Sequence, residues 1–127
     1  MCEENEDWDV IHSYTRAQAI ADGVLVDVSD LARKTGFKFP VAITEAVWTV
    51  IEAIPEVYKW TQNPRDRLFD VLTMAAYAAR FKTNLNLVSF KVDMDTIQGR
   101  RIVDLKMICG PVDHVEPVAT IMFPEED

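Results

Sequence analysis

The spacing of apolar residues changes once along this chain, after residue 84, and this change limits the fold more than any other feature. Before it, apolar residues recur at intervals of three and four, which is typical of amphipathic helices. After it, they alternate with polar residues, which is typical of strands with one buried face. The alternating residues are Val88, Phe90, Val92 and Met94, then Val103, Leu105, Met107 and Cys109. This pattern predicts an antiparallel hairpin with one dry and one wet face.

The first helix is predicted over residues 16–22, because both of its ends carry signals. Thr15 and Gln18 have the spacing of a capping box, in which each side chain binds the backbone amide of the other residue. Gly23 suits the position after the helix, because glycine adopts the left-handed conformation at little cost.

Three further helices are predicted from caps and prolines. Ser29 is expected to cap a short helix. Pro40 suits the first turn of the next helix, which Pro55 would end. Asn63 is a good cap for the fourth and longest helix, which would run to the change of spacing.

These elements predict an α+β fold with a mainly antiparallel sheet and helices packed on one face, in the order β-α-β-α-α-α-β-β-β. An acidic tail at residues 1–9 precedes a single domain over residues 10–127. The last strand, 118–123, is apolar on both faces, which favours a central or covered place in a three-stranded meander. The first two strands are predicted at 10–14 and 24–28.

The net charge of −8 argues against direct binding of nucleic acid, which depends on Lys and Arg neutralising phosphates. A local basic patch would have to come from Arg100 with Arg101, or from Lys34 with Lys38. Solvated surface charge is the simpler interpretation of these residues.

Cys2 and Cys109 are too few for a disulfide framework or a zinc site, so both are expected as reduced thiols in a cytoplasmic protein. The start of the chain is acidic, unlike a signal peptide. No apolar run approaches the roughly 20 residues that cross a bilayer. We expect no metal, no cofactor and no membrane partner.

Two groups of residues are candidates for catalysis. His12 and Tyr14 precede the first helix, whose free amides could hold a phosphate or dinucleotide; the alternative is a structural histidine at a strand end. Asp113, His114 and Glu116 lie in a Gly-Pro loop, where a carboxylate beside a histidine could bind metal or move protons. The alternative is an ordinary polar turn. The chain has no Gly-rich phosphate loop, zinc pair or nucleophile elbow.

Tyr58 and Trp60 are the candidates for binding, because they lie in a connector among polar residues. Aromatic side chains in such a place are frequent anchors of protein interfaces. Packing into the core is the alternative for both.

Two segments resemble a family of small uncharacterised bacterial proteins encoded on plasmids, conjugative elements and prophages. They are residues 10–48, which begin Val-Ile-His-Ser-Tyr-Thr-Arg-Ala, and residues 105–127, which contain Ile-Cys-Gly-Pro-Val-Asp-His. The chain departs from the family pattern at Val112 and Glu125, where that pattern has glycine. The family has no assigned activity, so the resemblance supplies no catalytic residue.

A second, fainter similarity concerns element order. A strand with a histidine, a helix ending at glycine and further strands resemble the start of ADP-ribosyltransferase-type folds, which implies that His12 would touch NAD. The Gln-x-Glu or Glu-x-Glu motif of those enzymes is missing near the last strands.

Three functions follow as hypotheses. The first is a non-enzymatic accessory protein of a mobile element that binds a host or element-encoded protein, with an acidic surface suited to inhibiting a defence nucleoprotein. The alternative is a small nucleotide- or NAD-binding enzyme. The third is a homodimer scaffold that exposes Trp60.

Overall fold

The computed structural model describes residues 15–80, 87–96, 99–112 and 116–126, and it confirms the predicted α+β class. A five-stranded mixed sheet has the order β1-β2-β5-β4-β3. Its strands are β1 (Leu25–Asp27), β2 (Val41–Thr44), β3 (Leu87–Thr96), β4 (Gly99–Val112) and β5 (Glu116–Met122). Only β2 and β5 pair in parallel, while the other neighbours are antiparallel.

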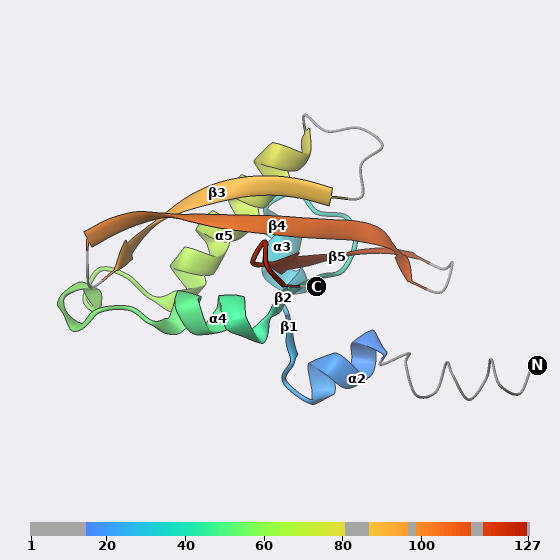
Figure 1. Ribbon diagram of the computed structural model, residues 1–127, viewed down its shortest axis with the longest axis horizontal. Coiled ribbons are helices and arrows are strands. Elements are labelled where there is room, and N and C mark those ends of the chain that lie inside the picture. The colour runs from blue at the N-terminus through green and yellow to red at the C-terminus, as the bar shows by residue number, and fades with distance from the viewer. Residues whose placement is uncertain (1–14, 81–86, 97–98, 113–115, 127) are drawn as a thin grey trace, which may run out of the picture.

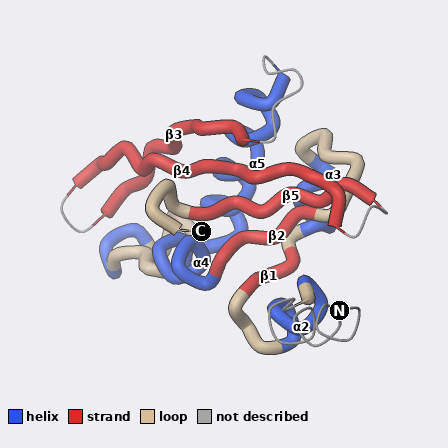
Figure 2. Tube along the Cα trace, turned by 45° about the vertical axis from the view of Figure 1, so that its right-hand side comes forward, coloured by secondary structure: helices blue, strands red, loops and turns tan. Residues whose placement is uncertain are grey.

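Three helices cover one face of the sheet, as the sequence predicts (Figure 1). The described residues form four α-helices, α2 (Arg16–Ala21), α3 (Ser29–Lys34), α4 (Glu45–Glu52) and α5 (Pro64–Arg80), and a short 3-10 turn, η1 (Glu56–Tyr58). The covering layer consists of α3, α4 and α5, and α5 crosses β3. The short α2 lies apart from this layer, next to β1 at the end of the sheet (Figure 2).

The core lies between the sheet and this helical layer. The predicted alternation is confirmed in β3, where every second side chain is buried. The helices contribute an apolar stripe each, because residues three and four apart share one face. The stripes are Val47 and Ile51 of α4, and Leu68, Val71, Leu72 and Ala75 of α5.

Several element ends also agree with the sequence. The capping box at Thr15 is present, and Gly23 has φ +82°. The Asn63 Oδ1 accepts the amide of Asp66 at 2.9 Å, so Asn63 caps α5. The central place expected for the last strand is confirmed, because β5 pairs with β2 on one side and β4 on the other.

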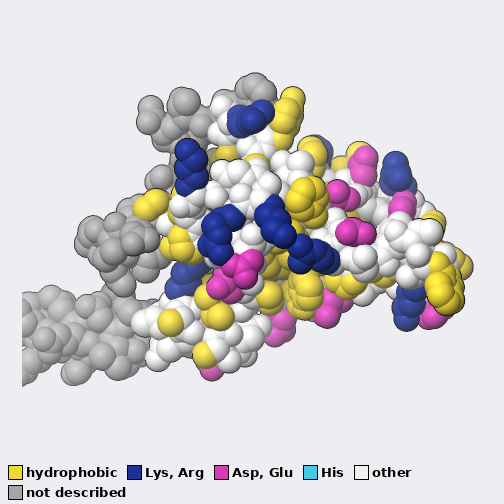
Figure 3. Space-filling model, turned by 180° about the vertical axis from the view of Figure 1, so that it is seen from behind, with side chains coloured by type: hydrophobic (Ala, Val, Ile, Leu, Met, Phe, Trp, Pro, Cys, Tyr) yellow, Lys and Arg dark blue, Asp and Glu magenta, His cyan; other side chains and the backbone are white. Residues whose placement is uncertain are grey.

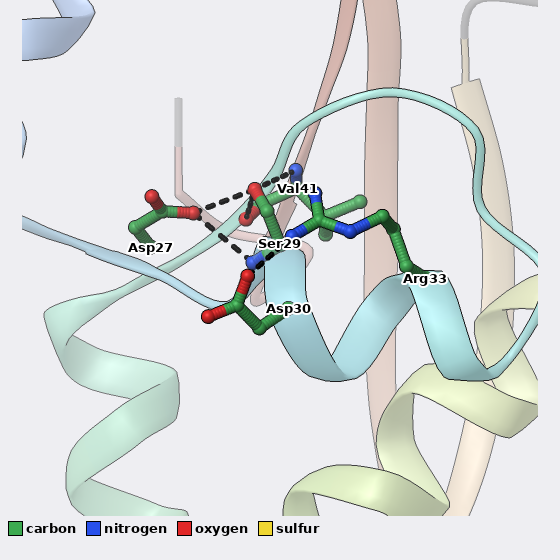
Figure 4. A network of polar contacts seen from close by, with 5 residues as sticks. All are labelled: Asp27, Ser29, Asp30, Arg33 and Val41. Atoms are coloured by element: carbon green, nitrogen blue, oxygen red, sulfur yellow. Dashed lines mark hydrogen bonds and ion pairs between the residues drawn. The ribbon is translucent and has the colours of Figure 1, made fainter.

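The prediction that Ser29 caps a helix is wrong in its detail. Ser29 is the first residue of α3, and Val28 stands at the cap position without a side-chain bond. The Ser29 hydroxyl instead donates to the Asp27 carboxylate at 2.6 Å and accepts the Val41 amide at 3.0 Å (Figure 4). It therefore ties α3 to the neighbouring strand, a long-range contact that local spacing cannot reveal.

The prediction of one helix from Pro40 to Pro55 is also wrong. Residues 41–44 form β2, and α4 begins only at Glu45, with Thr44 as its cap. The strand forms because it can pair with β1 and β5 at once and bury every side chain up to Ile43. The predicted strand at 10–14 and the tail at 1–9 lie outside the described residues.

Candidate protein-interaction site

The side chains of the predicted catalytic residues are not among those that the structure describes. His12, Tyr14, Asp113 and His114 lie outside the described residues, and Glu116 is described only as the first backbone position of β5. The catalytic roles of both groups stay predictions.

The N-terminus of α2, where the hypothesis of a nucleotide-binding enzyme places a phosphate, already uses part of its hydrogen-bonding capacity. The amide of Gln18 donates to the Thr15 hydroxyl at 3.0 Å, and the Gln18 side chain accepts the Thr15 amide at 3.0 Å. Arg16 points to β5, where it donates to the Thr120 hydroxyl at 2.8 Å and to the Ala119 carbonyl at 2.6 Å. Burial lowers the pKa of Arg16, and Asp27 opposes that change. Arg16 thus fastens α2 to the sheet.

The predicted binding residues lie in a turn with its own hydrogen bonds, residues 55–62, which we call the aromatic turn. The amide of Tyr58 donates to the Pro55 carbonyl at 2.9 Å, and the amide of Gln62 donates to the Tyr58 carbonyl at 2.8 Å. Lys59 and Glu56 add a surface ion pair at 3.2 Å. The backbone of the turn is thus held in one shape before any partner arrives.

The aromatic turn presents large apolar side chains to solvent. Trp60 is 94% exposed and Val57 is 78% exposed, whereas Tyr58 is half-buried against the turn. Exposed single apolar residues are common, but a nearly fully exposed tryptophan beside a second apolar side chain is not. Val57 was not among the predicted binding residues, although its place in the same polar connector was a usable signal.

Gln62 fastens the aromatic turn to the sheet. Its Nε2 donates to the Asp95 carboxylate at 2.8 Å, and its Oε1 accepts from Arg67 Nε at 3.2 Å. The turn therefore contacts the end of β3 and the first part of α5. Such anchoring holds Trp60 in a defined position relative to the domain.

Arg67 is the buried polar residue that the sequence did not single out. It is 6% exposed, and its guanidinium donates to the carbonyls of Val50, Ile51 and Ala53 at 3.3–3.5 Å. A further nitrogen donates to the Asp95 carbonyl. Since the last carbonyls of a helix lack partners and carry partial negative charge, Arg67 caps α4 from the side. Its position on the buried stripe of α5 was the only sequence signal.

A hollow of about 260 Å³, which we call the acidic hollow, lies beside Arg67. It is lined by Asp66 and Asp70 of α5, by the stretch 92–95 of β3 and by Arg100. The hydrogen bond from Gln62 holds the pKa of Asp95 below its usual value, with Arg100 and Arg67 acting the same way against burial. Burial raises the pKa of Asp70, and the charge of Asp66 adds to this. No group of acidic, histidine or cysteine side chains in the described ranges has a metal-binding arrangement.

The acidity of the chain is concentrated at its ends. Residues 1–9 contain five acidic residues and 124–127 contain three, and neither stretch contains Lys or Arg. Because the chain has 21 acidic and 13 basic residues, residues 10–123 contain 13 of each sign. Residues 10–123 are therefore balanced in charge rather than acidic.

The helix-covered face illustrates this balance, because Lys and Arg side chains gather near its middle (Figure 3). Exposed Arg33 and Lys34 come from the last turn of α3, and Arg33 pairs with Asp30. Of the predicted basic pairs, Lys34 and Lys38 are both exposed, whereas Arg100 is paired with Asp95 at 3.3 Å.

A model of a protein family of unknown function, DUF6573, matches residues 1–127. The chain belongs to this family. The sequence predicted a family without an assigned activity, and this is confirmed. The family is DUF6573, and its model matches the whole chain.

No curated protein and no solved structure gives a significant match to this member of DUF6573. Among the described residues, no helix is long and apolar enough to cross a bilayer.

Proposed function

We propose that this DUF6573 protein is a protein-binding module that contacts its partner through the aromatic turn. The observation that supports this proposal is the exposure of Trp60, 94%, on a turn whose backbone is already hydrogen-bonded. A tryptophan buries a large apolar area when a partner covers it, and few residue types contribute more to binding.

The turn has two properties that lower the cost of binding. Its backbone is ordered by the bonds around Tyr58, so little conformational entropy is lost on contact. Its link through Gln62 to Asp95 and Arg67 connects it to the core. A partner pocket that accepts Trp60 and Val57 would therefore meet a preformed surface.

The partner we propose is a protein of the host or of the mobile element that carries the gene. The resemblance of residues 10–48 and 105–127 to proteins of plasmids, conjugative elements and prophages supports this choice. A role as an acidic inhibitor of a defence nucleoprotein would depend on the ends of the chain, since the remainder has balanced charge.

Site-specific photo-crosslinking in the native host tests the proposal. A photoreactive phenylalanine derivative at Lys59 lies next to Trp60, and the same group at Lys38 reports on a distant exposed position. We expect one protein to be crosslinked from position 59 and not from position 38. Trp60→Ala should reduce that product at least tenfold, as expected for an interface anchor.

The matched control is Tyr77→Ala, because Tyr77 is an exposed aromatic residue on α5. It should leave the crosslinked product unchanged. Equal crosslinking in wild type and in Trp60→Ala would remove the aromatic turn from the interface. Far-ultraviolet circular dichroism should be identical for all variants, because neither side chain is buried.

A further inference from the structure

The outer edge of β3 is the longest backbone surface without a partner in the described part of the chain. β3 has ten residues and lies at one end of the sheet, and no described strand lies beyond it (Figure 2). Long exposed edges are ready templates for another strand, and proteins normally shorten, twist or cover them.

The register of the β3–β4 hairpin shows which backbone groups point outward. Thr96 and Gly99 are partners across a two-residue connection. Residues in these positions of a tight hairpin bond to each other, and the bonding direction then alternates along the strand. The odd-numbered residues from Leu87 to Asp95 therefore turn their amides and carbonyls away from β4.

One contact supports this assignment and limits the open edge. The Asp95 carbonyl accepts a hydrogen bond from Arg67, so it does point away from β4 and is already occupied. The open part of the edge is thus 87–94. Its outward backbone groups belong to Leu87, Ser89, Lys91 and Asp93.

Opposite charges lie two residues apart in the middle of this open part. The Lys91 side chain is 69% exposed and contacts Asp104 on β4 at 2.6 Å. Asp93 is exposed and has no hydrogen bond or ion pair with another described residue. Both side chains lie on the face of the sheet opposite to α5.

These charges distinguish the registers in which two copies could pair antiparallel about a two-fold axis. An axis at Lys91 places Lys91 opposite itself, and an axis at Asp93 places Asp93 opposite itself. An axis at Val92 places Lys91 opposite Asp93 twice, and the backbone groups of both residues then point toward the partner strand. Opposite charges in facing positions stabilise a sheet, and like charges destabilise it.

On the other face, α5 supplies a cover for an added strand. The last turns of α5 extend past β3 in both views (Figures 1 and 2). A groove of about 570 Å³ with a mainly apolar lining begins at Met74, Tyr77 and Ala78 of α5 and at the stretch 89–91 of β3. It continues to Asp104 and Leu105 of β4 and to Pro124.

The geometry points to a homodimer in which two copies pair antiparallel along residues 90–94 of β3, with the two-fold axis at Val92. The contact is isologous, so each copy contributes the same surface. Lys91 of each copy faces Asp93 of the other, and the sheet becomes continuous over ten strands. Pairing ends where Arg67 occupies the Asp95 carbonyl.

Charge reversal tests this arrangement. Lys91→Asp places two facing pairs of aspartates at the junction, and Asp93→Lys places two facing pairs of lysines. Each variant alone should weaken dimerisation by roughly tenfold to a hundredfold. An equimolar mixture of the two should form a heterodimer, because every facing pair is then opposite in charge. The readout is mass by light scattering and sedimentation from micromolar to near-millimolar protein.

Lys38→Asp is the control, since Lys38 is exposed and lies outside β3. It should dimerise like the wild type. The mixture also separates a folding defect from a lost contact, because a misfolded variant cannot be rescued by its partner. A wild type that stays monomeric throughout, a dimer unaffected by either reversal, or a mixture without heterodimer would each overturn the proposal.

Discussion

The two edge strands of the sheet, β1 and β3, differ in length and in how much of each is held by hydrogen bonds to other parts of the chain. At one end, β1 has three residues, and its flanking groups are engaged: the Val24 carbonyl accepts the Glu45 amide at 3.0 Å, and Asp27 binds Ser29. At the other end, β3 has ten residues and is closed by Arg67 only at Asp95. The short end is completed by local contacts, whereas the long end is left open over most of its length.

This difference indicates which end serves the fold and which is available for assembly. The contacts around β1 all lie within residues 24–45, one continuous stretch of the chain. The contacts of Arg67 join α4, α5 and β3 and depend on the finished tertiary structure. Substitutions at Arg67 and Ser29 therefore compare what the two sets of contacts contribute to the stability of the fold.

The largest effect is expected for Arg67→Met, which removes the cap of α4 and leaves buried carbonyls without a donor. Methionine retains much of the buried volume, so the loss reports mainly on hydrogen bonds. We expect a loss of about 3 kcal/mol in the free energy of unfolding, measured by urea denaturation. Arg65→Met, an exposed change two residues earlier on α5, should cost less than about 0.5 kcal/mol.

A smaller loss is expected at the short end for Ser29→Ala. The change leaves the Val41 amide without its hydroxyl acceptor and frees the Asp27 carboxylate. We expect a loss of about 1–2 kcal/mol by the same measurement. Asp30→Ala, one residue away with its side chain in solvent, is the control. Equal losses for the two variants would mean that Ser29 does not join α3 to β2.

These contacts also show where sequence reasoning succeeds. The hairpin, the capping box at Thr15 and the start of α5 at Asn63 depend on residues a few positions apart, and all three were predictable. β2 was not, because its four residues continue the helical spacing of α4. Only pairing with β1 and β5, which are far away in sequence, selects the strand.

The candidate site also has some features that local sequence predicts and others that depend on residues far away in the chain. Tyr58 and Trp60 were recognisable as interface candidates from their polar surroundings in the sequence. Their role in binding stays a prediction. The turn geometry around them depends on Gln62 reaching Asp95, 33 residues later in the chain. Arg67 was missed because its place on the buried stripe of α5 was the only local signal, while its hydrogen-bond acceptors come from α4 and β3.

Asp95 gives a pH-dependent test of the contact between the aromatic turn and β3. Its pKa is lower in the folded protein than its usual 3.8, chiefly through the hydrogen bond from Gln62. The carboxylate therefore stabilises the fold at neutral pH, and this contribution is lost as pH falls through the folded-state pKa. The stability difference between wild type and Asp95→Asn should be present at pH 7 and shrink below about pH 4. A difference that stays constant down to pH 2 would contradict the assignment.

The smallest effect is expected for Asp70→Asn, and it has the opposite sign. Burial and the neighbouring Asp66 raise the pKa of Asp70, so its charged form is disfavoured in the fold. At pH 7 the carboxyl is ionised in both folded and unfolded chains, and an uncharged amide removes that penalty. Since the group is largely open to solvent, we expect a gain of only a few tenths of a kcal/mol, seen as a small rise in melting temperature. The gain should shrink as the pH falls toward the ordinary pKa of 3.8 and vanish well below it, where the wild-type carboxyl is protonated in both states. A loss of stability at pH 7 would instead show that the Asp70 carboxylate makes a favourable contact in the acidic hollow.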